Sequence, residues 1–452
     1  MNAVQSLPLD RERLEAVVRE VLDQAQKAGA SAAEAAVSCD NGLSVNVRLG
    51  EVETLEYHRD QGVGVTVYFG NRKGSASTSD LKSEALRETV EAAARIARYT
   101  AEDPCAGLAD AALMAHDYPD LDLDHPWALE AEDAIVLARD CEAAAMQADA
   151  RINNSEGSEL STFRGTAIYG NSHGFIGGYT GTRHSLSCTV VAEDEGGMQR
   201  DYWYSVARDR SALESPAEVG RHAAERTLRR LGARRLSTRE APILFAPELA
   251  RGVIGHFVAA IRGGALYRKA SFLLDALGEP IFPDFVRIHE RPHLQGALGS
   301  APFDGEGVRT GERDVVSNGV LQGYVLDSYS ARKLGLVTTG NAGGVHNLLI
   351  EPGSVTGGTA DQAGLLKEMG TGLLVTELIG HGVNTVTGDY SRGAAGYWVE
   401  NGELAWPVEE ITVAGNLRDV FRRIVAVGSD VDARGNIQSG SLLVERMTIA
   451  GE

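Results

Sequence analysis

Residues 388–415 read GDYSRGAAGYWVENGELAWPVEEITVAG and decide how the C-terminal half folds. The run Tyr397-Trp398-Val399 is typical of a strand, and Asn401-Gly402 is typical of the two-residue turn of a β-hairpin. The preceding residues, 388–396, have no regular apolar period and contain an acid, a serine and an arginine. We therefore expect a polar loop at residues 388–396, presented on a rigid sheet.

Short strands and hairpin turns occur throughout the same half of the chain. Val315–Ser317 and Val320–Leu326 flank Asn318-Gly319, and Leu373–Leu378 is almost entirely apolar. These patterns are typical of strands joined by tight turns. They predict a β-rich, barrel-like C-terminal domain over residues 236–452, with polar loops gathered on one side.

The N-terminal half mixes helical and strand periodicity. Alternating apolar residues from Leu43 to Leu49 and from Val63 to Phe69 predict strands, and a turn is expected at Asn41-Gly42. Helices are expected on either side, one of them from about Leu81 to Arg98. We predict two α+β modules of mixed helices and antiparallel strands, at residues 1–115 and 116–235, so that the whole chain has an α+β fold.

Composition excludes several classes of protein. The 452 residues are 43% hydrophobic and 23% charged, which is typical of a soluble globular chain. The net charge of −20 argues against direct binding of nucleic acid, which needs a basic surface. The first 25 residues indicate an amphipathic helix after Asp10 rather than a signal peptide, and no apolar run is long enough to span a membrane. We expect a cytoplasmic protein with no membrane partner, whose four widely spaced cysteines are buried thiols.

Three motifs of the C-terminal half identify a family resemblance. They are GNAGGVHN at residues 340–347, VTELIGHGVN at 375–384 and GDYSRGAAG at 388–396. In this order they resemble the TldD/PmbA family of bacterial proteins, which are called metalloproteases and also modulators of DNA gyrase. The match is closest to the PmbA (TldE) branch and extends over nearly the whole chain. It implies the α+β N-terminal part and the barrel-like C-terminal part that the patterns predict.

The resemblance also implies that this chain lacks the zinc site of its catalytic sister. In TldD, a helix carries HExxxH, whose two histidines bind zinc, and a cysteine far downstream is the third ligand. Here those positions are Gly255, His256 and Ala260, and the cysteines, Cys39, Cys105, Cys141 and Cys188, all lie in the N-terminal half. Zinc needs three protein ligands even in an open catalytic site. We expect no cofactor, no metal ligand and no catalytic residue in this chain, and zinc in the partner subunit.

The resemblance implies a non-catalytic subunit of a TldD/TldE protease acting in peptide processing. Its partners would be a TldD-like catalytic subunit, a second copy of itself when alone, and unfolded peptides. Glycine-rich loops beside short strands can accept an extended peptide, and an arginine can bind a carboxylate, although Arg392 could equally form a fixed ion pair within its loop. The candidate peptide-binding residues are Gly343, Gly344, His381, Asn384, Asp389 and Arg392.

Two alternative functions are open at this point. Residues 289–293, His-Glu-Arg-Pro-His, match the HExxH pattern, so that the chain could be an autonomous zinc peptidase using His289 and His293. That chemistry needs an unbroken helix, and Pro292 would interrupt one. The chain could also be a non-enzymatic regulatory binder, with its acidity mimicking nucleic acid toward DNA gyrase.

Overall fold

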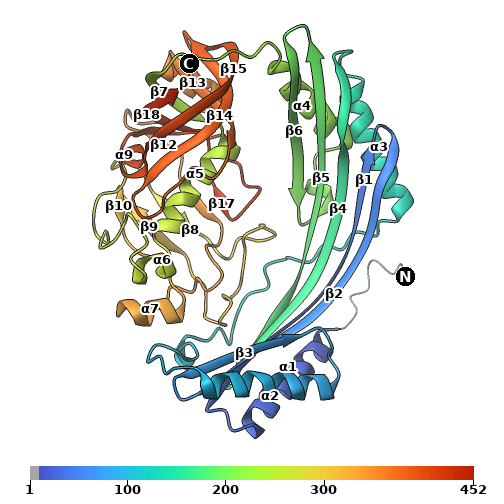
Figure 1. The fold of residues 1–452 in the computed structure, drawn as a ribbon, viewed down its shortest axis with the longest axis vertical. Coiled ribbons are helices and arrows are strands. Elements are labelled where there is room, and N and C mark those ends of the chain that lie inside the picture. Colours follow the sequence, from blue (N-terminus) through green and yellow to red (C-terminus); the bar gives the residue numbers. More distant parts are fainter. Residues whose placement is uncertain (1–9, 452) are drawn as a thin grey trace.

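The structure is a computed structural model that describes residues 10–451, and it consists of two β-structures side by side (Figure 1). The N-terminal half forms one six-stranded antiparallel sheet in the order β3-β2-β1-β4-β5-β6. Figure 1 shows its long strands curving as an arc beside the C-terminal half. The strands are β1 (Ala32–Arg48), β2 (Glu51–Phe69), β3 (Arg72–Thr78), β4 (Ile152–Asn171), β5 (Ile176–Asp194) and β6 (Gly197–Ala207).

Two pairs of helices pack on one face of this sheet. Val37 packs with α1 and α2, whereas Val45 packs with α3 and α4. Because alternate residues of a strand share a face, both helix pairs cover the same side. The helices are α1 (Arg11–Lys27), α2 (Ser83–Tyr99), α3 (Ala131–Met146) and α4 (Pro216–Arg229), with short 3-10 turns at Ala111–Leu113 and Arg210–Ala212. Since β1 pairs with β4, the sheet runs through both predicted modules, and the module boundaries stay a prediction.

The turn expected at Asn41-Gly42 is wrong, because both residues lie inside β1. Asn41 pairs with Arg59 of β2, and Gly42 pairs with Phe163 of β4. A side chain at Gly42 would place its Cβ 2.1 Å from the ring of His58. The glycine therefore leaves room for a neighbouring side chain within a continuous strand, a role that the dipeptide alone does not distinguish from a turn.

The C-terminal half is built around a closed barrel of five strands. Strand β7 pairs with both β13 and β18, which closes the ring β7-β13-β14-β15-β18. Its strands are β7 (Arg239–Phe245), β13 (Gly372–Ile379), β14 (Asp389–Glu400), β15 (Glu403–Asn416) and β18 (Leu442–Ala450). The short strands β16 (Ile424–Val427) and β12 (Gly353–Ser354) continue the sheet outward from β18. The predicted α+β fold with a barrel-like C-terminal domain is confirmed.

Smaller elements complete this half. A second sheet contains β8 (Ile288–Glu290), β9 (Arg313–Ser317), β10 (Val320–Leu321), β11 (Leu348–Ile350) and β17 (Ile437–Gln438). The helices are α5 (Pro247–Ala260), α6 (Gly263–Tyr267), α7 (Ser328–Leu334), α8 (Gln362–Met369) and α9 (Leu417–Arg422). One apolar core joins α5 and α9 to both sheets, with Phe257, Phe282 and Phe421 in contact at its centre.

The polar loop expected at residues 388–396 is instead the first half of β14. Asp389 pairs with Asn416 of β15, and Gly393 pairs with Ile379 of β13. Tyr390 and Ala394 are buried, whereas Asp389 and Ser391 are exposed, so that the strand alternates between two faces. The closed barrel supplies a partner strand on each side, and this pairing outweighs the weak strand propensity of the local sequence.

The sequence predicts buried cysteine thiols and no apolar segment long enough to span a membrane, and the structure can be compared with both predictions. Cys39, Cys141 and Cys188 are buried, Cys105 is partly buried, and none of the four is in a disulfide bond among residues 10–451. Within residues 10–451, no helix combines the length and the apolar character that a membrane crossing requires.

Candidate functional site

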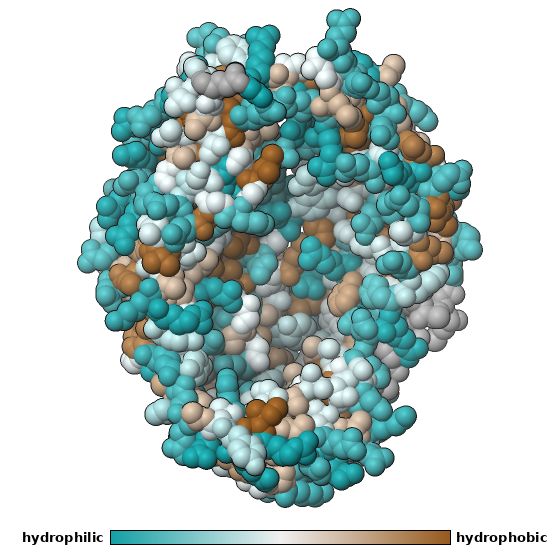
Figure 2. All heavy atoms as spheres, in the orientation of Figure 1, coloured by the Kyte–Doolittle hydropathy of each residue, from teal (hydrophilic) through white to brown (hydrophobic). Residues whose placement is uncertain are grey.

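The two halves of the molecule enclose a hollow, visible in the space-filling view between the sheet and the C-terminal domain (Figure 2). One cavity in this region has a volume of about 450 Å³. Ala36 and Ala167 of the sheet line one side, and Gly343 and Gly344 line the other. The sheet also contributes two aromatic residues, Tyr169 and Tyr179, so that the lining combines small and aromatic side chains.

A compact aromatic and ionic contact joins the two halves. The Arg434 guanidinium lies between the rings of Trp203 and Tyr204, at 4.4 and 4.3 Å from their centres. Asp432 accepts a hydrogen bond of 2.9 Å from Arg434, and Arg251 of α5 donates one of 2.7 Å to the Tyr204 hydroxyl. Helix α5 is thereby attached to the edge strand β6.

The Gly343–Gly344 loop takes its shape from buried polar groups beside it. Both glycines have positive φ, 111° and 132°, which side-chain-bearing residues rarely adopt. The Asn341 side chain donates a hydrogen bond of 2.9 Å to the Gly344 carbonyl and one of 2.8 Å to the Glu290 carboxylate. Arg313 forms a 2.8 Å ion pair with Glu290. A Cβ on either glycine would meet no atom within 4 Å, so the glycines are needed for backbone conformation rather than for space.

His381, Asn384 and Asp389 lie on the turn that leads from β13 into β14. The backbone N–H of Asn384 donates a hydrogen bond of 2.8 Å to the Asp389 carbonyl. The side-chain oxygen of Asn384 accepts one of 2.9 Å from the backbone N–H of Val386. Thr387 donates to the Asp389 carboxylate at 2.6 Å, and Asn416 donates to it at 3.2 Å. These two hydrogen bonds hold the pKa of Asp389 below its usual range. The polar groups of Asn384 and Asp389 thus keep the turn folded.

Arg392 lies on the opposite face of β14 and has a different environment. Its side chain is partly buried and donates one hydrogen bond, from Nη2 to the Leu378 carbonyl at 3.2 Å. Its Nε is buried with no hydrogen-bond partner, as is the hydroxyl of Tyr390 on the same face of the strand. The ring of His256, on α5, lies 5.9 Å from the Tyr390 ring. The fixed ion pair considered for Arg392 is not present among residues 10–451.

The structure places the six candidate residues in two groups on either side of α5. Gly343 and Gly344 line the cavity, together with Asn436, whose side chain donates to the Val345 carbonyl at 3.4 Å. A Cβ on Gly255 of α5 would lie 3.8 Å from the neighbouring Ile437. The other four residues lie around the start of β14 and do not line this cavity: His381, Asn384, Asp389 and Arg392.

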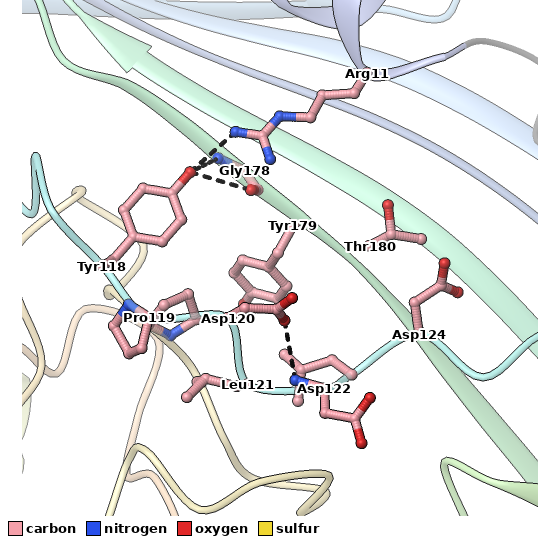
Figure 3. Close-up of a pocket in the computed structure, with 12 residues that line it drawn as sticks. Arg11, Tyr118, Pro119, Asp120, Leu121, Asp122, Asp124, Gly178, Tyr179 and Thr180 are labelled. Atoms are coloured by element: carbon pink, nitrogen blue, oxygen red, sulfur yellow. Dashed lines mark hydrogen bonds between the residues drawn. The ribbon is translucent and has the colours of Figure 1, made fainter.

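A further cavity, of about 370 Å³, lies where residues 118–124 run beside β5, near Arg11 of α1 (Figure 3). Arg11 donates to the Tyr118 hydroxyl at 3.1 Å, and the same hydroxyl lies 3.3 Å from the Gly178 carbonyl. Asp124 forms a 2.7 Å ion pair with Arg164. Arg11 also forms an ion pair with Glu15, so that Arg11 and Asp124 are already bound within the protein and the cavity indicates a structural joint.

Comparison with known proteins identifies the family. Models of the PmbA/TldA metallopeptidase domain 1, central domain and C-terminal domain match residues 33–97, 124–231 and 238–451. The chain belongs to the PmbA/TldD family. It is 53% identical to the metalloprotease PmbA of Escherichia coli O157:H7 over 100% of this chain and 99% of that protein.

Solved structures agree with the membership in the PmbA/TldD family. A crystal structure of a proposed DNA gyrase modulator from Bacteroides thetaiotaomicron is 30% identical, with a TM-score of 0.91 over 98% of this chain and 100% of that one. The fold also matches TldE from Thermococcus kodakarensis, at 19% identity and a TM-score of 0.84 over 96% of this chain and 100% of that one.

The family name implies a metal, so the residues on α5 need to be compared with the ligands of zinc. The positions at which the family resemblance implies HExxxH in a catalytic sister are Gly255, His256 and Ala260, which provide a single imidazole. Burial is the larger cause that lowers the pKa of the His256 ring, and the charge of the Arg392 guanidinium lowers that pKa further. A cation would be repelled by the same charge, and zinc requires at least three nitrogen, oxygen or sulfur ligands. The residues at this position of the PmbA/TldD fold do not fit zinc.

The HExxH pattern at residues 289–293 does not form a zincin helix. His289 lies in β8, and its Nδ1 is 2.6 Å from the Asp314 carboxylate. His293 follows in a loop, where its Nε2 is 2.9 Å from the Thr310 hydroxyl. No group of three potential ligands from His, Cys, Asp or Glu suited to a metal occurs in the described part of the chain. Whether the purified protein binds zinc stays a prediction to be tested.

Sequence reasoning missed Tyr390 and His256 as members of a site. Tyr390 lies inside residues 388–396, for which the sequence predicts a loop, and in a loop the spacing of two residues does not indicate a shared face. His256 was noted only at a position where zinc chemistry is lost. The signal that could have joined them is the two-residue spacing of Tyr390 and Arg392, which places both on one face of a strand.

Proposed function

We propose that this chain is a PmbA/TldE-type subunit of a TldD/TldE metalloprotease that processes peptides, and that it supplies no zinc of its own. The observation that carries this proposal is the surface of α5, where one histidine and a nearby guanidinium stand in place of a ligand set. The protein would act in the cytoplasm. Catalysis would require a TldD-like partner that carries HExxxH.

An open strand edge supports assembly with a partner. Strand β3 pairs only with residues Val63–Phe69 of β2, so that residues Glu51–Gly62 of β2 have one neighbouring strand in the described part of the chain. Leu55 and Tyr57 on this segment are 43% and 56% exposed. Unpaired edges with apolar side chains readily add a strand from another chain.

The charge of this edge favours the sister chain over a second copy. The edge segment 51–62 contains one arginine, Arg59. It contains more acidic residues than that: Glu51, Glu53, Glu56 and Asp60. Like charges that face each other across paired strands are destabilising. We propose that the edge binds a less acidic strand of the TldD-like subunit, and that the homodimer expected of the chain alone is the weaker assembly.

The cavity between sheet and C-terminal domain would admit the peptide in extended form. Backbone groups of the Gly343–Gly344 loop are suited to main-chain contacts, which tolerate many sequences. The cluster around the start of β14 would contact side chains or chain ends. All six candidate residues remain part of this proposal: Gly343, Gly344, His381, Asn384, Asp389 and Arg392.

Metal analysis combined with reconstitution tests the proposal. We expect the purified chain to contain far less than one zinc per molecule, the TldD-like sister to contain about one, and only the mixture to cleave an unfolded peptide. A full zinc equivalent that disappears when His289 and His293 are both replaced by alanine would support the autonomous peptidase instead. Robust cleavage by the metal-free chain alone would refute both.

The assembly surface has its own test. The double substitution Leu55→Asp with Tyr57→Asp should abolish the heteromer in size-exclusion chromatography with light scattering. Val355→Asp is a matched control, because Val355 is 55% exposed on the C-terminal half. An unaffected heteromer in the first variant would show that the subunits meet elsewhere.

Binding to DNA gyrase remains the non-enzymatic alternative. It is favoured by the name of the structurally similar Bacteroides protein, which is described as a proposed modulator of DNA gyrase. Pull-down of purified gyrase by this chain, without the sister and without cleavage of any peptide, would support that function.

A further inference from the structure

Arg392 is a cationic group without an anionic partner. Among residues 10–451 it forms no ion pair: its Nη2 donates to the Leu378 carbonyl, its side chain lies against the Tyr390 hydroxyl, and its buried Nε has no acceptor. Two other arginines of the C-terminal half differ, since Arg313 pairs with Glu290 and Arg287 pairs with Asp314, both at 2.8 Å. A partly buried charge that lacks a counter-ion is destabilising, and the planar, permanently charged guanidinium suits the binding of a carboxylate or phosphate.

Two further hydrogen-bond donors accompany this guanidinium. The Tyr390 side chain is 2% exposed, and its buried hydroxyl makes no hydrogen bond of normal geometry. Burial raises the pKa of Tyr390 to about 12, with the nearby charge of Arg392 acting in the opposite direction, so that the hydroxyl keeps its proton at neutral pH. Burial, followed by the Arg392 charge, lowers the pKa of His256, whose neutral ring then carries one N–H.

The three groups converge from two elements. Tyr390 and Arg392 project from one face of β14 toward α5, where the His256 ring meets the Tyr390 ring edge to face at 5.9 Å. The charges that act on His256 and Tyr390 come from Arg392 and from no carboxylate. An anion entering here would meet a guanidinium, a phenol O–H and an imidazole N–H, and no negative group to repel it.

We propose that His256, Tyr390 and Arg392 form a binding site for a carboxylate of the peptide. A carboxylate offers about four lone pairs and can accept two parallel hydrogen bonds from a guanidinium, with capacity left for a hydroxyl or ring N–H. One arginine matches its single negative charge. The carboxylate is either the C-terminus of the peptide or the side chain of an aspartate or glutamate.

This site deepens the proposed function, because its ligand is the peptide that the proteolytic pair would process. The position on α5 is significant, since the corresponding helix of TldD carries the zinc ligands. In the non-catalytic subunit the same helix face would hold a peptide by its negative group. The role of Arg392 is therefore recognition, without any participation in bond cleavage.

Binding of labelled peptides to the full chain tests the site. A fluorescein-labelled, unstructured peptide without acidic residues is prepared with a free C-terminal carboxylate and with a C-terminal amide, and a third peptide combines the amide with an internal glutamate. A hydrogen bond to a charged group strengthens binding about tenfold or more relative to a ligand that lacks the charged group. We expect fluorescence anisotropy to show at least tenfold tighter binding of one carboxylate peptide than of the acid-free amide. The peptide that binds identifies the source of the carboxylate.

Substitutions decide whether these three residues are responsible. Arg392→Gln should remove the preference for the carboxylate peptide, Arg392→Lys should retain only part of it, and Tyr390→Phe should reduce it several-fold. Arg422→Gln is the matched control, because Arg422 is exposed on α9 of the same half. Equal binding of all three peptides, or an unchanged preference in Arg392→Gln and Tyr390→Phe, would overturn the proposal.

A second measurement does not depend on peptide affinity. NMR spectra of ¹³C-histidine-labelled protein are recorded during a titration with sodium acetate. We expect the His256 signal, assigned with His256→Gln, to shift in a saturable manner that Arg392→Lys weakens. No shift beyond that of the Arg392→Gln protein would contradict the site. Both experiments use the chain alone, so that failure of the carboxylate site and failure to pair with a TldD-like subunit are distinguishable.

Discussion

The first residues of β14 have polar side chains on two faces of the strand, and the two faces differ in how many hydrogen bonds these side chains form. On the outer face, Asp389 accepts hydrogen bonds from Thr387 and Asn416, and the turn before it is closed by backbone bonds. On the inner face, Tyr390 and Arg392 retain buried polar atoms without partners. Among residues 389–392, the Asp389 side chain stabilises the turn, whereas Tyr390 and Arg392 keep buried polar atoms without hydrogen-bond partners. Polar residues of one motif therefore need to be assigned individually.

Arg313, another partly buried arginine of the C-terminal half, shows the same contrast with Arg392. Arg313 binds Glu290, Asn341 and the Tyr324 carbonyl, and Glu290 is only 2% exposed. Arg392 has no comparable set of partners. We therefore expect Arg313 to contribute stability and Arg392 to contribute binding.

The largest expected effect is on stability. Arg313→Met leaves the Glu290 carboxylate buried without its counter-ion, a change that costs about 3–5 kcal/mol. Arg392→Met removes a charge that has no anionic partner, so its effect on the free energy of unfolding should stay within about 1 kcal/mol. Urea denaturation of both variants measures the difference. Equal destabilisation would show that Arg392 is also a structural residue, and the contrast between the two arginines would be lost.

The glycine loop should show a smaller loss of stability. Gly344→Val forces a β-branched residue to a φ of 132°, a strained conformation that costs about 1–3 kcal/mol. Because a Cβ there would meet open space, the expected damage is to loop conformation and hence to peptide cleavage by the mixed complex. Thermal denaturation and cleavage assays are run together, with exposed Gly311→Val as the control. A Gly344→Val complex with full stability and full activity would remove this loop from the proposed site.

Cleavage by the mixed complex should separate the two faces of β14. Arg392→Gln is expected to lower kcat/KM for a carboxylate-bearing peptide about tenfold, or about 1.4 kcal/mol, without changing pairing or the zinc content of the sister. Asp389→Asn should also impair cleavage, but together with a lower melting temperature, because it weakens the hydrogen bonds of the turn. If Asp389→Asn impaired activity with no change in stability, the outer face would be a contact surface as well.

The smallest effect concerns pH. Burial and the Arg392 charge lower the pKa of His256 in the folded state, so its contribution to stability is present above its unfolded pKa near 6.5. That contribution is lost as the pH falls from about 6.5 through the folded pKa. Denaturation midpoints measured between pH 7 and pH 5 should therefore decline less steeply in His256→Gln than in the wild type. An identical decline would indicate that His256 is not desolvated beside Arg392.

Much of the architecture follows from local sequence patterns. The alternation of apolar residues at Val63–Phe69, the Asn401-Gly402 turn and the apolar run Leu373–Leu378 correspond to strands and a hairpin of the structure. The helix expected from about Leu81 to Arg98 is α2. These features are decided by neighbouring residues, because periodicity and turn geometry act over a few positions.

The sequence by itself determined the α+β class, the family and the residues that stand where zinc ligands would be. Only the tertiary structure decided that residues 389–396 form a strand, because their pairing depends on β13 and β15, which close a barrel with strands distant in the sequence. It also decided which polar groups have partners. Whether Arg392 meets a carboxylate depends on every element packed around it, and β14 and α5 are brought together only by the fold.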